Sequence, residues 1–125
     1  KARDAFLVID AFLIEHGLQE TSLYFLNQLD LAIALSHLEE YGAARTANET
    51  ALAGYTRMFG PSHPEVAYCW NHQAIVLLGM GDLAAAKEAH QNAKHTALMS
   101  AGEGAEIHDS ILRWGRKNAA LLNQD

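Results

Sequence analysis

The sequence predicts an all-α fold, a right-handed superhelical array of antiparallel helical hairpins with about six helices. The first observation behind this prediction is a repeat of forty-two residues, and a fixed period of this length is typical of stacked helical units. The second is that glycine and proline divide the chain into segments of helical length, while no stretch alternates apolar and polar residues as a strand does. The repeat relates five pairs of residues: Ala32, Tyr41, Ala44, Ala51 and Gly60 return as Ala74, Leu83, Ala86, Ala93 and Gly102.

The expected helices follow from these breaks. Gly17 ends the first helix, and the run GPSHP at 60–64 separates the third from the fourth. Ser62 with Glu65 is a capping-box pattern, and proline is tolerated in the first turn of a helix. Alanines three or four residues apart in the third and fifth helices form stripes at which neighbouring helices can approach closely. We expect helices over residues 2–16, 22–40, 43–59, 64–80, 83–100 and 106–122.

Composition and charge exclude several classes of protein. The 125 residues carry a net charge of −6 with nine scattered Lys and Arg residues, whereas nucleic-acid-binding domains display basic patches. A membrane-spanning helix needs about 20 apolar residues, and the apolar run over residues 5–14 is shorter and contains Asp10. The single cysteine, Cys69, rules out an internal disulfide and fits a reducing compartment. We therefore expect an intracellular, cytoplasmic protein that binds neither nucleic acid nor membranes.

The repeat also sets the expected domain organisation. We expect one helical domain over residues 1–125, belonging to a larger protein because the chain starts with Lys rather than Met. The first helix is apolar nearly all round, and such a helix is normally buried on most sides. We expect another part of the parent protein, or a second copy of the chain, to cover it through residues 5–14. Within the domain we expect a half repeat over residues 1–17, full repeats over 21–60 and 63–102, and a terminal helix over 105–122.

These residues resemble tetratricopeptide repeats in the longer form found in kinesin light chains. That form places small residues and Tyr at set positions and starts the next helix with Gly-x-x-His-Pro-x-Val-Ala, which reads GPSHPEVA at 60–67. Glu39 stands where the turn glycine is usual, and Ala105 with Glu106 replaces His-Pro at the last junction. The resemblance covers about residues 20–122 and implies a scaffold that binds a protein or peptide and has no catalytic residues.

A second resemblance concerns the run YTRMFGPSHP at 55–64 and the residues 77–86 that follow. Both are similar to the C-terminal helical domain of SET-and-MYND lysine methyltransferases. The chain has neither the zinc-binding MYND cysteines nor a SET segment. This resemblance therefore implies an alternative function, a non-catalytic accessory domain that restricts substrate access and recruits partners.

Chaperone-binding tetratricopeptide proteins use a carboxylate clamp of Lys, Asn and Arg side chains, whose charged hydrogen bonds hold the C-terminal carboxylate of a peptide. We expect no such binding here, because none of the equivalent positions carries Lys, Arg or Asn. By repeat position, the clamp falls on Leu29, Ile33, His72, Ser110 and Trp114.

The same inward-facing positions predict a groove on the concave surface, where repeat arrays bind their partners. An apolar floor with a basic and aromatic end would hold an extended or helical peptide with an acidic or hydrophobic segment. The alternative is that Leu29, Ile33 and Ile75 simply pack against a neighbouring helix or domain. The residues predicted to contact a partner are Leu29, Ile33, Tyr68, His72, Ile75, Arg113, Trp114 and Lys117, with Leu26 beside them.

No sequence pattern predicts catalysis. His90 and His95 lie five residues apart, whereas a helical metal pair is spaced by four, and there is neither a His-Glu-x-x-His motif nor a cysteine cluster. Cys69 and His72 share a helix face, but no third group orients the histidine for nucleophilic catalysis. We therefore predict no enzyme activity, no catalytic residue, no cofactor and no metal ion.

Overall fold

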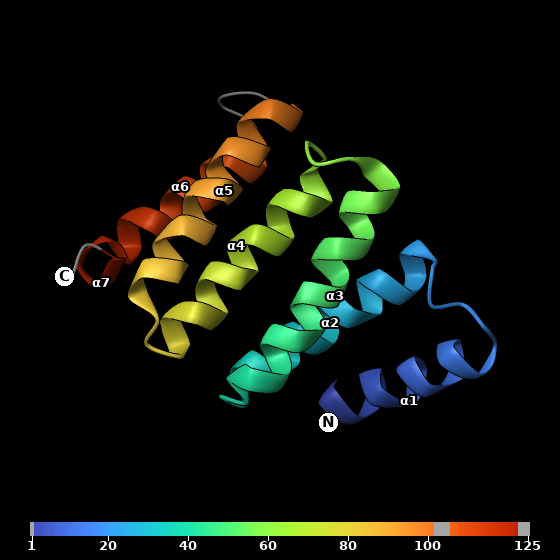
Figure 1. The fold of residues 1–125 in the computed structure, drawn as a ribbon. Helices are drawn as coiled ribbons and strands as arrows, with labels where there is room; N and C mark the ends of the chain where they lie inside the picture. Colours follow the sequence, from blue (N-terminus) through green and yellow to red (C-terminus); the bar gives the residue numbers. More distant parts are fainter. Residues whose placement is uncertain (1, 102–105, 123–125) are drawn as a thin grey trace.

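The computed structural model describes residues 2–101 and 106–122, and nearly all of these residues are helical. No strand occurs within these two ranges, so the all-α prediction is confirmed. Among the described residues seven helices follow one another (Figure 1): α1 (Ala2–Glu15), α2 (Ser22–His37), α3 (Tyr41–Phe59), α4 (Pro64–Gly79), α5 (Leu83–Ala101), α6 (Glu106–Lys117) and α7 (Ala119–Leu122).

The helices pair into antiparallel hairpins that stand side by side. α2 packs against α3 and α4 against α5, while α1 packs on α2 and α6 on α5. In Figure 1, α1 lies at one end of the array, and α6 with the short α7 lies at the other. Clusters of buried apolar residues join each helix to the next. The predicted array of helical hairpins is therefore confirmed.

Small residues let the two helices of each hairpin approach closely. The four predicted contact points, Ala44, Ala51, Ala86 and Ala93, are completely buried, which confirms the repeat register. Gly54 acts in the same way in α3, because a Cβ there would lie 2.3 Å from the ring of Phe25. The small residues therefore set the spacing between the paired helices.

Several helix ends differ from the predicted bounds, and hydrogen bonds accompany two of the differences. α2 ends at His37 rather than at residue 40, because the N–H of Glu40 turns back and donates to the carbonyl of Leu35 at 2.9 Å. The last segment is divided at Asn118 into α6 and α7. There the side-chain amide of Asn118 donates to the carbonyl of Trp114 at 2.9 Å.

The start of α4 also differs from the predicted capping box. Its N-cap is His63 rather than Ser62, and Nδ1 of His63 accepts a hydrogen bond from the N–H of Glu65 at 3.1 Å. The ring of His63 stacks on that of Phe59, with centroids 4.4 Å apart. The loop histidine therefore caps α4 and ties it to the end of α3.

Candidate functional site

Two hollows follow one another along α2 and α4. The inner hollow has a volume of about 390 Å³, and the outer hollow, near the start of both helices, has about 350 Å³. Leu26 and Leu29 lie one turn apart on α2, as do Glu65 and Tyr68 on α4, so the two hollows are neighbours, and we call them together the α2–α4 groove. The inner hollow is lined by Leu29, Ile33, Ser36, His37, Tyr41, Tyr68, Asn71, His72 and Ile75, and the outer hollow by Ser22, Leu23, Leu26, Tyr55, Phe59, His63 and Glu65.

The groove presents large apolar side chains to solvent. Its exposed large apolar residues are between 37% and 56% exposed, and they are Leu23, Leu26, Ile33, Phe59 and Tyr68. Among the described residues that line the two hollows, Glu65 is the one Asp, Glu, Lys or Arg. Contiguous exposed apolar surface of this kind is typical of an interaction site.

Five of the eight residues predicted to contact a partner come together in the inner hollow. Leu29 also belongs to the core, where it packs with Phe25 and Tyr55 and is only 7% exposed. For this residue the structure therefore agrees with the alternative interpretation, packing against a neighbouring helix. Ile33 and Tyr68 are exposed instead. The five are Leu29, Ile33, Tyr68, His72 and Ile75, and Leu26 lines the outer hollow beside them.

The structure does not bring the other three predicted residues to this groove. Arg113 and Lys117 are exposed on α6, and neither lines the inner or the outer hollow. Trp114 is half-buried and packs on the core between α4 and α5, close to Leu122. Its ring lies 5.2 Å from that of His90, measured between centroids. The basic and aromatic end expected for the groove is therefore not part of the α2–α4 groove.

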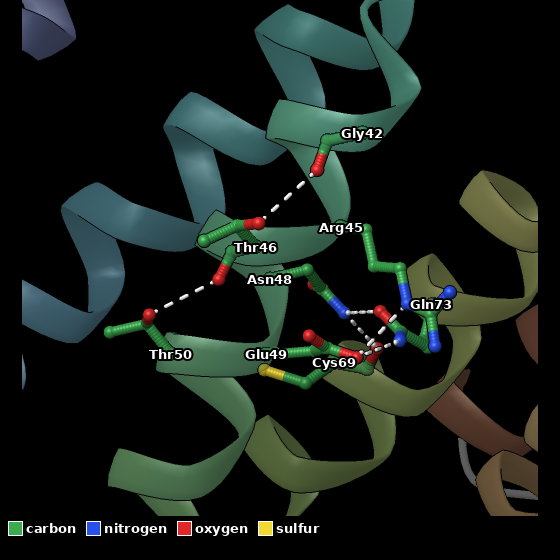
Figure 2. A network of polar contacts seen from close by, with 8 residues as sticks. All are labelled: Gly42, Arg45, Thr46, Asn48, Glu49, Thr50, Cys69 and Gln73. Atoms are coloured by element: carbon green, nitrogen blue, oxygen red, sulfur yellow. Dashed lines mark hydrogen bonds and ion pairs between the residues drawn. The ribbon is translucent and has the colours of Figure 1, made fainter.

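Buried polar side chains lie beneath the inner hollow. The imidazole of His72 has Nε2 at 3.2 Å from the hydroxyl of Ser36 and Nδ1 at 3.3 Å from Oδ1 of Asn48. Asn48 is completely buried, and its amide nitrogen donates to Oε1 of Gln73 at 2.8 Å and to the carbonyl of Cys69 at 3.0 Å. Figure 2 shows this amide reaching from α3 to α4. The groove thus rests on a network that joins three helices.

The network reaches the surface through Gln73. Its amide nitrogen donates to Oε2 of Glu49 at 3.2 Å, and Nε of Arg45 donates to the same oxygen at 3.1 Å (Figure 2). The amide nitrogen of Asn48 already has two acceptors, so it is the amide oxygen that faces Nδ1 of His72. Burial, and to a smaller extent nearby His37, lowers the pKa of His72 from 6.5 to about 4. The floor of the groove is therefore uncharged at neutral pH.

Asn48 is absent from the predicted site, although the repeat holds a signal for it. Asn48 and His90 lie forty-two residues apart and interrupt alanine-rich helix faces. Asn48 donates to the carbonyl of Cys69, and Nε2 of His90 donates to that of Ile111 at 3.1 Å. Since Cys69 and Ile111 are also forty-two residues apart, the same hydrogen bond ties α3 to α4 and α5 to α6. A polar residue that recurs after forty-two residues in an alanine-rich helix therefore indicates a hydrogen bond to the first helix of the next hairpin.

Two further findings concern catalysis and membranes. Within residues 2–101 and 106–122, no helix is both long and apolar enough to cross a bilayer, and no three His, Cys, Asp or Glu side chains are grouped so that they could hold a metal ion. Burial, with nearby Glu65 adding to it, raises the pKa of Cys69 to about 12. Its thiol is therefore protonated, and a poor nucleophile, at neutral pH.

An array of helical hairpins with a groove between the first helices of successive hairpins defines a helical-repeat protein. The family model described as tetratricopeptide repeat matches residues 23–93, and the chain belongs to this family. Tetratricopeptide repeats generally mediate protein–protein interaction and generally serve as non-catalytic scaffolds. The family predicted from the sequence is therefore confirmed, while the kinship with SET-and-MYND methyltransferases stays a prediction.

A solved structure shows the same fold. The crystal structure of BtubC (BKLC) from P. vanneervenii is similar to this chain with a TM-score of 0.74 at 16% sequence identity. The similarity covers 98% of this chain and 57% of that one, so the chain spans little more than half the length of BtubC. At this identity the likeness concerns the fold alone. No curated protein matches the sequence.

Proposed function

We propose that the chain is a non-catalytic interaction scaffold that captures a hydrophobic segment of a partner protein in the α2–α4 groove. The observation that carries this proposal is the row of exposed apolar side chains in the groove, among them Leu26, Ile33 and Tyr68. Solvent exposure of such a row is unfavourable unless a partner covers it, because burying apolar surface contributes about 25 cal/mol per Å².

The charges of the groove favour a hydrophobic partner segment over an acidic one. Arg113 and Lys117, which led us to expect an acidic segment, lie on α6 away from both hollows. The charged side chain that lines the groove, Glu65, is itself acidic, and His72 is neutral. An acidic peptide would therefore find no Lys or Arg among the described lining residues, whereas apolar side chains would find matching surface.

The length of the groove sets the size of the segment. α2 and α4 each have 16 residues, so the groove is about 24 Å long at a rise of about 1.5 Å per residue. A helical peptide of similar length fits lengthwise, as does an extended peptide of about seven residues. The proposal includes no nucleic acid, cofactor or metal ion, and it places the interaction in the cytoplasm, where a single buried thiol such as Cys69 stays reduced.

Selection from a phage-displayed library of random 16-residue peptides tests the proposal. The wild-type chain should enrich peptides with two or more large apolar residues, and Ile33→Glu should weaken their binding at least tenfold. Leu98→Glu is the matched control, because Leu98 is a similarly exposed apolar residue on α5 and lines neither hollow. Circular dichroism checks that both variants stay folded. Peptides that bind Ile33→Glu as tightly as the wild type would contradict the proposal.

A further inference from the structure

Another hollow, of about 260 Å³, lies between α5, α6 and α7, and we call it the basic hollow. Three basic side chains line it, Lys87 and Lys94 from α5 and Arg116 from α6. No Asp or Glu occurs among its described lining residues, and the neighbouring acids Glu88 and Asp109 do not line it. The chain has nine Lys and Arg residues and a net charge of −6, so this is a local concentration of positive charge in an acidic protein.

The basic hollow has a counterpart of about 550 Å³ between α1, α2 and α3. Five residues of the basic hollow each lie two repeats of forty-two residues after a lining residue of this counterpart. Residues of α3 line the counterpart as well, and it is open all the same. An open hollow at this place in the repeat therefore occurs also where a further helix packs beside it. The five residues are Lys87, Gln91, Leu112, Gly115 and Ala119.

A basic residue recurs at one position of α1, α3 and α5, and in the first two helices an acid neutralises it. In α1 the residue is Arg3, whose Nη1 donates to Oε2 of Glu40 at 2.7 Å. In α3 it is Arg45, whose Nε donates to Oε2 of Glu49 at 3.1 Å. In α5 the residue is Lys87. The repeat thus shows how the charge at this position is normally compensated.

The basic hollow lacks this compensation. Gln91 stands forty-two residues after Glu49 and carries no charge. None of the ion pairs within residues 2–101 and 106–122 includes Lys87, Lys94 or Arg116. Like charges that line one hollow repel each other, and an anion between them removes this repulsion.

The three cations approach the hollow from two helices. Lys87 and Lys94 are seven residues apart, which is two turns on the same face of α5 and about 10 Å along the helix axis. Their flexible four-carbon stems let both ammonium groups lean toward Gln91, which lies between them. Arg116 lines the hollow from α6, and its guanidinium offers the planar pair of donors that suits phosphate oxygens.

We propose that the basic hollow binds a phosphoryl group carried by a serine side chain of a partner protein. Such a group has a charge of about −1.5 to −2 at pH 7 and three strong acceptor oxygens, so it matches three cations better than a single carboxylate does. Leu112 and Leu122 also line the hollow. They offer apolar surface to the carbon atoms of a phosphorylated residue, which free phosphate does not have.

This proposal goes beyond capture of a hydrophobic segment and does not depend on it. The basic hollow shares no residue with the α2–α4 groove, so failure at one site leaves the other unaffected. A single phosphoryl group held by a few charge-assisted hydrogen bonds should bind with a dissociation constant of about 0.1–1 mM. The affinity should fall as salt is added, because exposed charges are screened.

NMR titration with a seven-residue peptide, a phosphoserine flanked by three alanines on each side, tests the site. The backbone amide signals of Gln91 and Gly115 should shift saturably, and the same peptide with unmodified serine should shift neither. Lys87→Gln and Arg116→Gln should each weaken binding at least threefold, and both side chains are exposed, so the variants should stay folded. Arg45→Gln removes the same charge at the equivalent position of α3 and should bind like the wild type.

Two further ligands test the chemical class. Inorganic phosphate, and the peptide with glutamate in place of phosphoserine, should each bind at least threefold more weakly than the phosphoserine peptide. Equal binding of inorganic phosphate would overturn the assignment to a protein side chain, and equal binding of the glutamate peptide would overturn the preference for a phosphoryl group. The site itself would be disproved if the phosphoserine peptide left Gln91 and Gly115 unshifted, or if Arg45→Gln weakened binding as much as Arg116→Gln.

Discussion

Glu39 and Gly81 lie forty-two residues apart and have the same left-handed backbone conformation, with φ of 59° and 83°. Each ends the first helix of a hairpin in the same way. The N–H of Glu40 donates to the carbonyl of Leu35, and the N–H of Asp82 donates to that of Leu77 at 3.0 Å. This backbone conformation favours glycine, because any Cβ is crowded by the following carbonyl. Glu39 therefore adopts a strained turn that its counterpart adopts without strain.

Glu39→Gly should stabilise the protein. Relief of the left-handed strain contributes about 1 kcal/mol to the free energy of unfolding, and no hydrogen bond or ion pair of the Glu39 side chain occurs among the described contacts. Gly81→Ala is the reverse control. A Cβ there would meet nothing within 4 Å, so only the left-handed backbone conformation would make alanine destabilising. Urea unfolding should give opposite changes for the two variants, and changes of the same sign would contradict this account of the turn.

Gly54→Ala should destabilise the protein although alanine is the better helix former. A Cβ at this position would lie 2.3 Å from the ring of Phe25, and overpacking of this kind costs about 1–3 kcal/mol. Gly42→Ala, in the same helix, is the matched control because a Cβ there meets nothing within 4 Å. It should stabilise α3 by up to about 1 kcal/mol. Equal effects in thermal melts of the two variants would mean that α2 and α3 are not in close contact at Gly54.

The stability of the fold should fall as the pH is lowered toward 5, because His72 is buried without charge. Its pKa is about 4 in the folded protein against an ordinary value of 6.5, so the unfolded chain takes up the proton first. Stability is therefore fully present above pH 6.5 and is lost as the pH falls toward 4. Between about pH 7 and about pH 5 the loss should be roughly 2 kcal/mol. Burial lowers the pKa of His90 as well, which adds a loss of the same sign.

Urea unfolding at the two pH values measures this loss in the wild type and in His72→Gln. The variant should lose clearly less stability on acidification, because it lacks the group that titrates. His95→Gln, in which an exposed histidine is replaced, should behave like the wild type. A pH dependence that is identical in all three proteins would show that His72 is not held neutral by the fold.

Trp114→Ala should destabilise the last hairpin by about 2–4 kcal/mol, because the indole packs on the core beside Leu122 and His90. Arg113→Ala, on the neighbouring exposed position, should change the free energy of unfolding by less than about 0.5 kcal/mol. Thermal melts of the two variants give the comparison. Equal midpoints would place Trp114 on the surface instead of in the core.

Much of the fold could be predicted from the sequence because local chemistry determines it. The break at 60–64 and the period of forty-two residues place the helices, and Ala44 and Ala86 are small because helices meet there. The inner hollow could be predicted in the same way, since Ile33 and Ile75 keep equivalent positions. These features depend on spacing along the chain, which the sequence shows directly.

The rest depends on neighbours that the period does not specify. Trp114 is the repeat equivalent of His72, yet it packs on the core. Gly115 makes this possible because it lets the ring of His90 approach α6. A Cβ at position 115 would lie 2.3 Å from that ring. The buried network around Asn48 likewise needs Gln73 at the right distance on another helix. Both arrangements depend on how the side chains of two different helices fit together, and one sequence alone does not show that fit.

The central claim, capture of a hydrophobic segment in the α2–α4 groove, is tested most directly by NMR of the isoleucine δ1 methyl groups. Ile9 and Ile14 report on α1, Ile33 and Ile75 on the groove, and Ile107 and Ile111 on the core at α6. A peptide selected from the random library should shift the Ile33 and Ile75 methyl signals saturably and leave the other four unchanged. Saturable binding that shifts Ile9 and Ile14, or Ile107 and Ile111, while Ile33 and Ile75 stay unchanged would contradict the claim.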